Sequence, residues 1–254
     1  MSRIKDARRG IDRCALARRT VLVAGTGSAL ALLAGCAEPF FFHPSRITYV
    51  TRRMLGGRVE DVFFDSDGER LHGWWMPSIG PARVTLVHLH GNAANVSNHA
   101  RLVSWLPAER INVLTFDYRG FGFSGGTPSL DGVVDDARAA IDEARRRQPG
   151  VPIVLYGQSL GGSTAIRAAA EETRDDIRLL VAESAFASYR GIVRDATRRT
   201  VLALVGSIAA STLPREARDP AQAIARVRMP VLLLHGDSDR VVPIEHSERL
   251  HAAA

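Results

Sequence analysis

Short apolar runs alternate with amphipathic stretches along most of the chain. Five of the runs are rich in Val, Ile and Leu and predict strands buried on both faces, at 84–89, 111–116, 153–156, 179–182 and 231–234. Three stretches between them repeat their apolar positions with a helical period, at 97–106, 130–147 and 160–170. This alternation predicts an α/β fold with a mostly parallel sheet and helices on both faces.

Two further segments extend this outline. Residues 59–64 and 71–76 flank the turn sequence Asp65-Ser66-Asp67-Gly68, which predicts an antiparallel hairpin at the start of the sheet. Residues 187–213 have a helical pattern between two predicted strands. They fit either a cap over the carboxyl ends of the strands, which would shape a substrate pocket, or a plain pair of surface helices.

The chain has 254 residues, of which 46% are hydrophobic, so it can form one full-sized domain. Its net charge of +6 would suit a nucleic-acid partner if the charge lay on that domain. Residues 1–35, however, hold seven Lys/Arg and two acidic residues, and the rest of the chain holds 26 basic and 25 acidic residues. We therefore expect no nucleic-acid partner.

The first 35 residues have the layout of an export signal. A basic stretch ends at Arg18-Arg19, an apolar run follows at 20–34, and small residues precede Cys36. The run is shorter than the roughly 20 residues that a membrane-spanning helix needs. Leu33-Ala34-Gly35-Cys36 resembles the bacterial lipobox, in which the Cys is acylated and becomes the new N-terminus. The alternative is an ordinary Cys in an uncleaved anchor.

These features predict a lipoprotein signal peptide at 1–35, lipidation of Cys36, and a protein held by its acyl chains at a membrane of the cell envelope, on the periplasmic or extracellular side. Residues 18–22 also resemble a twin-arginine export motif, but weakly. Residues 36–58 are the expected tether to the domain at 59–254. Within this tether, Phe40-Phe41-Phe42 is expected to pack on the domain, because three adjacent Phe side chains in water would form an unusual apolar patch.

Ser159 is the strongest candidate for chemistry. It lies in Gly157-Gln158-Ser159-Leu160-Gly161, between a predicted strand and a predicted helix. In that setting Gly-x-Ser-x-Gly forms a sharp turn that lifts the serine hydroxyl above the sheet. The sequence therefore predicts a nucleophilic serine, and the alternative is a structural turn.

Four motifs in order resemble the α/β-hydrolase superfamily. They are the segments 88–93 (HLHGNA), 117–125 (DYRGFGFSG), the serine turn, and 235–243 (HGDSDRVVP). Within the superfamily they are similar to the serine aminopeptidase-like group, which includes membrane-associated acyl-protein thioesterases. The resemblance runs from about Val59 to the last residue.

The resemblance implies roles for three more residues. The backbone amides of Asn92 and Leu160 would form the oxyanion hole. Asp239 would be the acid of the catalytic triad, whereas Asp237 is expected to be a solvated turn residue. Asp117 and Arg119 are expected to brace their loop through a salt bridge rather than to act on substrate.

The triad also needs a histidine base, because a serine hydroxyl is a poor nucleophile without one. By the family pattern this base follows one more strand, some 25 to 30 residues after Asp239, whereas the sequence runs to Ala254. His246 and His251 fall in the helix expected directly after Asp239, and both are expected to be surface residues of that helix. We therefore expect the last strand, the base and the closing helix to be absent.

Two functions remain open. The first is a membrane-anchored serine hydrolase that cleaves a carboxylic ester, thioester or amide of a small-molecule or acyl substrate through an acyl-serine intermediate. The second is a catalytically impaired lipoprotein that keeps the hydrolase scaffold for binding or for a role in the envelope. No metal-ligand cluster or dinucleotide fingerprint is present in the sequence, so neither a metal nor a cofactor is expected.

Overall fold

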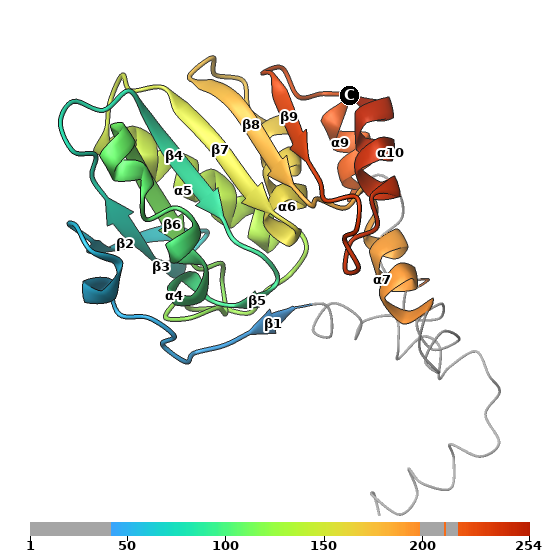
Figure 1. Cartoon of the computed structure of the whole chain (residues 1–254), viewed down its shortest axis with the longest axis horizontal. Helices are drawn as coiled ribbons and strands as arrows, with labels where there is room; N and C mark the ends of the chain where they lie inside the picture. The colour runs from blue at the N-terminus through green and yellow to red at the C-terminus, as the bar shows by residue number, and fades with distance from the viewer. Residues whose placement is uncertain (1–41, 199–210, 212–217) are drawn as a thin grey trace, which may run out of the picture. The chain divides into compact units, whose positions relative to one another are not determined.

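A seven-stranded sheet forms the centre of the computed structural model, which describes residues 42–198, 211 and 218–254. The strands follow the order β2-β3-β6-β4-β7-β8-β9 (Figure 1). They are β2 (Glu60–Ser66), β3 (Glu69–Met76), β4 (Val84–Leu89), β6 (Ile111–Phe116), β7 (Ile153–Gln158), β8 (Ile177–Glu183) and β9 (Val231–Leu234). β2 and β3 run antiparallel and the pairs from β6 to β9 are parallel, which confirms the predicted mostly parallel sheet. The predicted signal peptide, Cys36 and much of the segment 187–213 lie outside the described residues.

The hairpin β2–β3 forms where the turn sequence predicts it. Ser66 pairs with Glu69, and only Asp67 and Gly68 connect them. Both connecting residues have positive φ, 51° and 83°. Two-residue hairpins favour this backbone conformation, and Asp and Gly reach it at the lowest cost.

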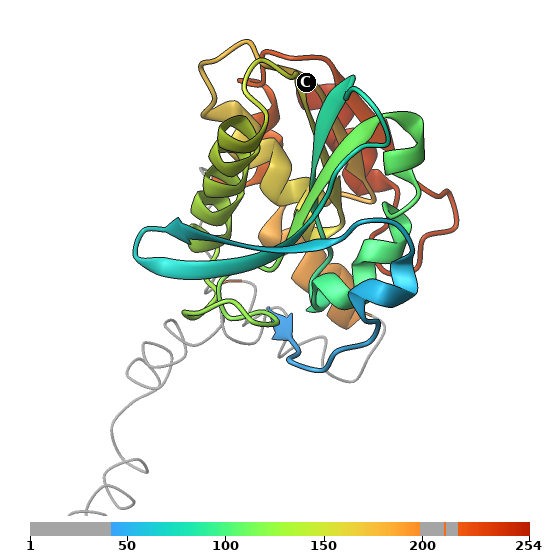
Figure 2. The ribbon, with the colours of Figure 1, turned by 90° about the vertical axis from the view of Figure 1, so that its left-hand side faces the viewer.

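Helices cover the sheet on both faces, as the apolar pattern predicts. On one face the core includes α5 (Gly132–Arg147), α6 (Leu160–Ala170) and residues of α9 (Pro220–Ile224) and α10 (Glu245–Ala253). A separate cluster forms around α4 (Val96–His99), and Figure 2 shows the α4 region across the sheet from α5. Val87 belongs to the first cluster and its neighbour Leu86 to the second, because successive side chains of a strand point to opposite faces.

The predicted continuous helix at 97–106 is wrong. The chain forms α4, then the 3-10 turns η2 (Ala100–Leu102) and η3 (Leu106–Glu109). Pro107 disfavours the α conformation for the residue before it, which helps to explain why no continuous helix forms. Val96, Ala100 and Val103 are nevertheless all buried against the sheet.

The segment before β2 also packs on the domain. Phe42 is 3% exposed and meets Phe121 edge to face at 6.4 Å, as the packing interpretation predicts for this Phe. The next two residues form β1 (His43–Pro44), which pairs in parallel with β5 (Ala93–Ala94). Residues 43–44 thereby lie beside residues 93–94, in the loop that follows β4.

At the other end of the sheet, β9 has one covered and one open face. Val231 and Leu233 pack against the core that contains α10, whereas Leu232 and Leu234 are 45% and 43% exposed. No helix within the described ranges is long and apolar enough to cross a membrane.

Candidate active site

Ser159 occupies a strained turn between β7 and α6. Its backbone has φ 54° and ψ −115°, a conformation that an L-residue rarely adopts and that costs on the order of 1–3 kcal/mol. Two backbone hydrogen bonds hold the turn, from Ser159 N to Glu183 O at 2.8 Å and from Ser163 N to Ser159 O at 3.1 Å. The serine therefore sits at the point where the strand ends and the helix begins, as Gly-x-Ser-x-Gly predicts.

The glycines of the motif are required for space rather than for their φ angles. A Cβ on Gly157 would lie 2.3 Å from Gly161 O, and a Cβ on Gly161 would lie 2.0 Å from Leu89 O. The positive φ of the turn falls on Ser159 itself. The two glycines thus let the turn pack against itself and against the end of β4.

The loop after β4 faces Ser159. An ideal Cβ on Gly91 would stand 4.0 Å from Ser159 Cβ. The Gly91 carbonyl oxygen lies 2.7 Å from His90 Nδ1, and a carbonyl can only accept, so this nitrogen is the donor. Because C=O and N–H point in opposite directions across a trans peptide, this bond aims the Asn92 amide away from the His90 ring.

The Leu160 amide directly follows Ser159 at the start of α6. Leu160 is the first residue of α6 and its side chain is fully buried. In the described part of the chain its amide donates no hydrogen bond, as expected for the first turn of a helix. The positive end of the helix dipole favours negative charge at this position.

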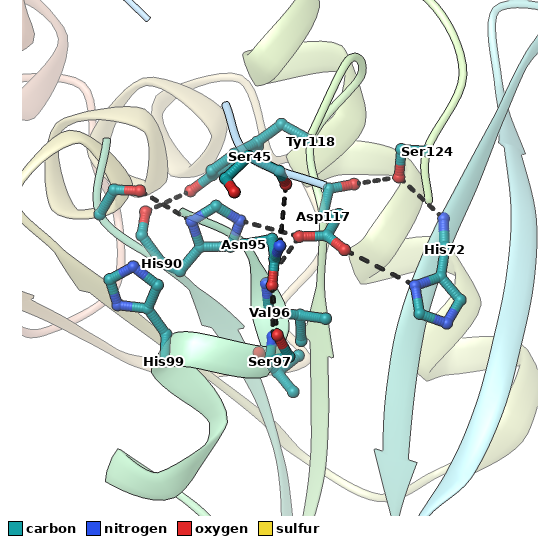
Figure 3. Close-up of polar contacts among 12 residues, drawn as sticks. Ser45, His72, His90, Asn95, Val96, Ser97, His99, Asp117, Tyr118 and Ser124 are labelled. Carbon is teal, nitrogen blue, oxygen red and sulfur yellow. Dashed lines mark hydrogen bonds and ion pairs between the residues drawn. The ribbon is translucent and has the colours of Figure 1, made fainter. Parts of the chain in front are cut away.

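Asp117 lies between His90 and His72, beside the loop that follows β4 (Figure 3). It is fully buried at the end of β6, and its Oδ1 accepts from Val96 N at 2.7 Å. His90 Nε2 lies 3.5 Å from Oδ1, and His72 Nδ1 lies 3.6 Å from Oδ2. Burial alone would raise the pKa of Asp117, but the neighbouring His72 and His90 outweigh it and the pKa is lowered.

His72 connects this carboxylate to a second one. Its Nε2 lies 3.0 Å from Asp61 Oδ1, so both ring nitrogens face carboxylates. Burial lowers the pKa of His72, but Asp117 and Asp61 more than offset this effect and the pKa is raised. The two acids thus favour the charged imidazolium more than water does around a free histidine.

His99 is a site residue that the sequence reasoning missed. Its Nε2 donates to Ala93 O at 2.9 Å, and its ring stacks on His90 with centroids 5.1 Å apart. Its Cε1 would lie 3.6 Å from a Cβ on Gly91, so it borders the same space as Ser159. Burial and the neighbouring His90 lower the pKa of His99 to about 4, which keeps the ring neutral at physiological pH.

Asp117 and Arg119 do brace their loop, but not through the salt bridge expected between them. The Arg119 guanidinium instead binds Asp136 on α5, with Nε and one terminal nitrogen 3.0 and 2.8 Å from Oδ1. The backbone amide of Arg119 adds a bond of 2.7 Å to Oδ2. Burial raises the pKa of Asp136 although Arg119 opposes this shift. The two charges two positions apart thus serve separate buried networks.

Asp239 follows β9 at the same edge of the sheet as Ser159. Its Oδ1 accepts from Val241 N and Val242 N at 2.8 and 3.0 Å. Burial acts to raise its pKa, but these amides and the Ser184 hydroxyl lower it, so the carboxylate stays ionised. Asp237 is exposed, as expected for a solvated turn residue.

His246 is not the surface residue that its place in the helix predicts. It is fully buried, and it accepts from Ala187 N at 3.0 Å through Nδ1 while its Nε2 lies 3.0 Å from Asp195 Oδ2. These partners come from the segment around α7 (Tyr189–Arg198), which a helical period cannot show. His251 is exposed, as predicted. No histidine within the described ranges forms a hydrogen bond with Ser159 Oγ.

Known proteins resemble the chain along most of its length. The family model described as serine aminopeptidase, S33, matches residues 80–224. The uncharacterized protein YfhR of Escherichia coli O157:H7 is 41% identical over 222 residues, which cover 85% of this chain and 74% of YfhR. The α/β-hydrolase domain-containing protein WAV2 of Arabidopsis thaliana is 30% identical over 249 residues, which cover 92% of this chain and 79% of WAV2.

Solved structures share the fold. The Pyrococcus furiosus esterase Pf2001 superposes with a TM-score of 0.70 at 22% identity, over 84% of each chain. Est1E of Butyrivibrio proteoclasticus superposes with a TM-score of 0.60 at 24% identity, over 76% of this chain and 85% of Est1E. The sheet order, the strained serine turn and these matches agree, and the chain therefore belongs to the α/β-hydrolase superfamily, in the family described as serine aminopeptidase, S33.

Proposed function

We propose that this protein is a serine hydrolase that cleaves a carboxylic ester, thioester or amide through an acyl-serine intermediate on Ser159. The observation that carries the proposal is the backbone of Ser159, which holds φ 54° between β7 and α6 and faces the Gly91 loop. Strain of this kind persists where the surrounding structure enforces it, and it clusters at active sites. The family is one of hydrolases, which supports the same reaction class.

The proposed reaction uses four groups of this chain. Ser159 Oγ attacks the carbonyl carbon of the substrate, and the carbonyl oxygen becomes an oxyanion. The amides of Asn92 and Leu160 donate to that oxyanion, each worth about 10² to 10³ in turnover by analogy with other oxyanion holes. The leaving group departs, and water then hydrolyses the acyl-serine. A general base must take the Ser159 proton and pass it to the leaving group. The ionised carboxylate of Asp239 is proposed to orient such a base, and no histidine among the described residues bonds to Ser159 Oγ.

Names of structural neighbours favour carboxyl substrates without choosing among them. Pf2001 is an esterase, and Est1E is solved with ferulic acid, a carboxylic acid, bound. Another neighbour, with a TM-score of 0.60, is the acylaminoacyl peptidase of Pyrococcus horikoshii. All three are less than 25% identical to this chain, so they share its fold and the proposal takes only the reaction class from them.

A second candidate function is a hydrolase-fold lipoprotein with little catalytic activity and a role in binding or in the envelope. The observation in its favour is that Ser159 Oγ has no histidine partner among the residues that the structure describes. A triad without its His keeps only the part of the rate enhancement that the oxyanion hole and substrate binding supply, about 10³ to 10⁴ over water.

We further propose that acyl chains on Cys36 hold the protein at an envelope membrane. The support is the lipobox-like sequence that ends at Cys36 and follows a basic and an apolar stretch. Labelling of growing cells with an alkyne-bearing palmitate tests it. The wild-type protein should take up the label and a Cys36→Ser variant should not, and equal labelling of the two would refute the anchor.

Hydrolysis of a series of p-nitrophenyl esters and thioesters by the whole protein tests the proposed enzyme. We expect turnover that a Ser159→Ala variant loses and that a Ser104→Ala variant keeps, because Ser104 lies between η2 and η3 and not in the serine turn. A folded wild-type protein that is no faster than Ser159→Ala would favour the non-enzymatic function.

A further inference from the structure

The segment from His43 to Ile47 lies along the loop that follows β4. It pairs in parallel with β5, with His43 opposite Ala93 and Pro44 opposite Ala94. Its amides donate into the loop, from His43 N to Asn92 O at 3.2 Å and from Ser45 N to Ala94 O at 3.0 Å. We refer to residues 43–47 as the strap.

A single buried side chain fastens the other edge of the strap. Asn95 is 4% exposed, and its Nδ2 donates to Ser45 O and to Ile47 O, both at 2.8 Å. Its Oδ1 accepts from Ser97 N at 2.9 Å and caps the first turn of α4. Gly122 N adds a bond to Ser45 O at 3.1 Å. Figure 3 shows Ser45 directly beside Asn95 and next to the Asp117 network.

Together with the strap, the surrounding side chains fix five carbonyls in a row, from His90 to Ala94. His90 O accepts from Tyr118 Oη at 3.0 Å, Gly91 O from His90 Nδ1, and Ala93 O from His99 Nε2. The remaining two, of Asn92 and Ala94, accept from the strap. Ala94 has φ 66°, so the loop holds a conformation that it would not adopt without such restraints.

The strap therefore acts on the residue whose amide the proposed mechanism uses. His90 fixes the peptide plane on the amino side of Asn92, and His43 N fixes the plane on its carboxyl side. With both planes held, the Asn92 N–H keeps its direction without reorganising when charge develops on a substrate.

We propose that the strap is a positioning element of the active site, which keeps the loop 91–94 in the conformation that presents its amides to the oxyanion. This inference rests on the proposed serine hydrolase function. It assigns a part in catalysis to residues between Cys36 and the first strand of the sheet, a stretch that the sequence presents as a connection. Residues 43–47 touch no substrate in this account, and they act only through the loop.

Two substitutions at one strap position test the proposal in the whole protein. Ser45→Pro removes the amide that reaches Ala94 O, whereas Ser45→Ala keeps this amide and removes only the hydroxyl. For ester hydrolysis we expect Ser45→Pro to lower kcat about 10- to 100-fold with KM within about twofold, since an oxyanion contact forms only in the transition state. Ser45→Ala should stay within about twofold of the wild type in both constants.

A second variant guards against a Ser45→Pro protein that does not fold. Asn95→Asp keeps the oxygen that caps α4 but replaces both donors to the strap with a carboxylate oxygen facing two carbonyls. It should lower kcat over the same range while KM stays near the wild-type value.

The outcomes separate this inference from the function on which it rests. If wild-type Ser159 reacts with a fluorophosphonate and the protein turns over ester, but folded Ser45→Pro or Asn95→Asp keeps the wild-type kcat, the strap has no positioning role and the serine hydrolase stands. A loss confined to KM would also refute positioning of the oxyanion loop. If the folded wild-type protein neither reacts with the probe nor turns over ester, the proposed function and this inference fall together.

Discussion

Gly161 offers a sharp test of how the serine turn packs. A Cβ at this position would lie 2.0 Å from the carbonyl oxygen of Leu89 and 2.6 Å from that of His90. Both atoms belong to backbone that β4 and the following loop hold in place, so a rotamer change cannot relieve the overlap. Gly161→Ala must therefore push the turn away from the strand by about 1 Å or more.

The expected magnitude follows from two opposing terms. Overpacking against backbone costs about 3 kcal/mol or more, and replacing Gly by Ala inside a helix returns about 1 kcal/mol. We expect Gly161→Ala to lower the free energy of unfolding by about 2–4 kcal/mol. Gly162→Ala is the matched control, because its Cβ would meet Ala185 Cβ at 2.9 Å and Gly157 O at 3.0 Å, a much smaller overlap, and it should lower the free energy of unfolding by clearly less than Gly161→Ala.

Urea unfolding followed by tryptophan fluorescence measures both variants. Trp74 and Trp75 are 5% and 4% exposed on β3, so unfolding changes their surroundings. If Gly161→Ala were as stable as Gly162→Ala, the close approach of the turn to β4 would be refuted.

Three further predictions concern the buried polar groups around the loop. At position 90, the amide nitrogen of an Asn would lie near His90 Nδ1, and that of a Gln near His90 Nε2. His90→Gln should therefore lower kcat for ester hydrolysis about 10²- to 10³-fold, and His90→Asn far less. Equal losses would contradict the orienting bond from Nδ1 to Gly91 O. Asp136→Ala leaves the Arg119 guanidinium, which is 13% exposed, without its carboxylate partner. The free energy of unfolding, measured in urea, should fall by about 3–5 kcal/mol. A loss below about 1 kcal/mol would show that the pair does not hold this loop. Because the pKa of His72 is raised on folding, its charge stabilises the fold fully below about pH 6.5, and this contribution is lost as the pH rises through the folded-state pKa. The difference in unfolding free energy between wild type and His72→Gln should therefore shrink as the pH rises. A difference that grew with pH would contradict the raised pKa of His72.

Local pattern was enough to predict the sheet. Three strands, β4, β6 and β9, begin and end at the predicted residues, since each is a mainly apolar run that starts directly after an Arg or a Pro. The α6 helix also matches its predicted range of 160–170. In these elements the hydrophobic period and the residues that end the element predict the same boundaries, and tertiary packing does not change them.

The polar contacts of the site were largely outside the reach of such patterns. Asn95 bonds to residues 48 and 50 positions away, and His246 to one 51 positions away, so neither contact leaves a local signal. Helical periodicity describes one helix alone and predicts a surface position for His246, because it cannot show that the segment around α7 packs on that helix. Arg119 pairs with Asp136 rather than with Asp117 because α5 passes its loop, which no spacing between the two neighbours could show.

Short motifs predicted where residues lie in the fold better than they predicted hydrogen-bond partners. Ser159 lies at a strand-to-helix turn and Gly91 lies beside it, as the motif order implies. The cause of the turn differed from the simplest expectation, since the left-handed backbone falls on the serine and the glycines provide room. The motif thus predicts that the chain turns sharply here, but not which residue of the turn has the left-handed backbone.

Covalent trapping is the sharpest test of Ser159 as the nucleophile. The folded whole protein is incubated with a fluorophosphonate, and the modified residue is mapped by peptide mass spectrometry. We expect one adduct, on Ser159, that is absent from Ser159→Ala. A folded wild-type protein without an adduct, or with one only on another residue, would contradict it.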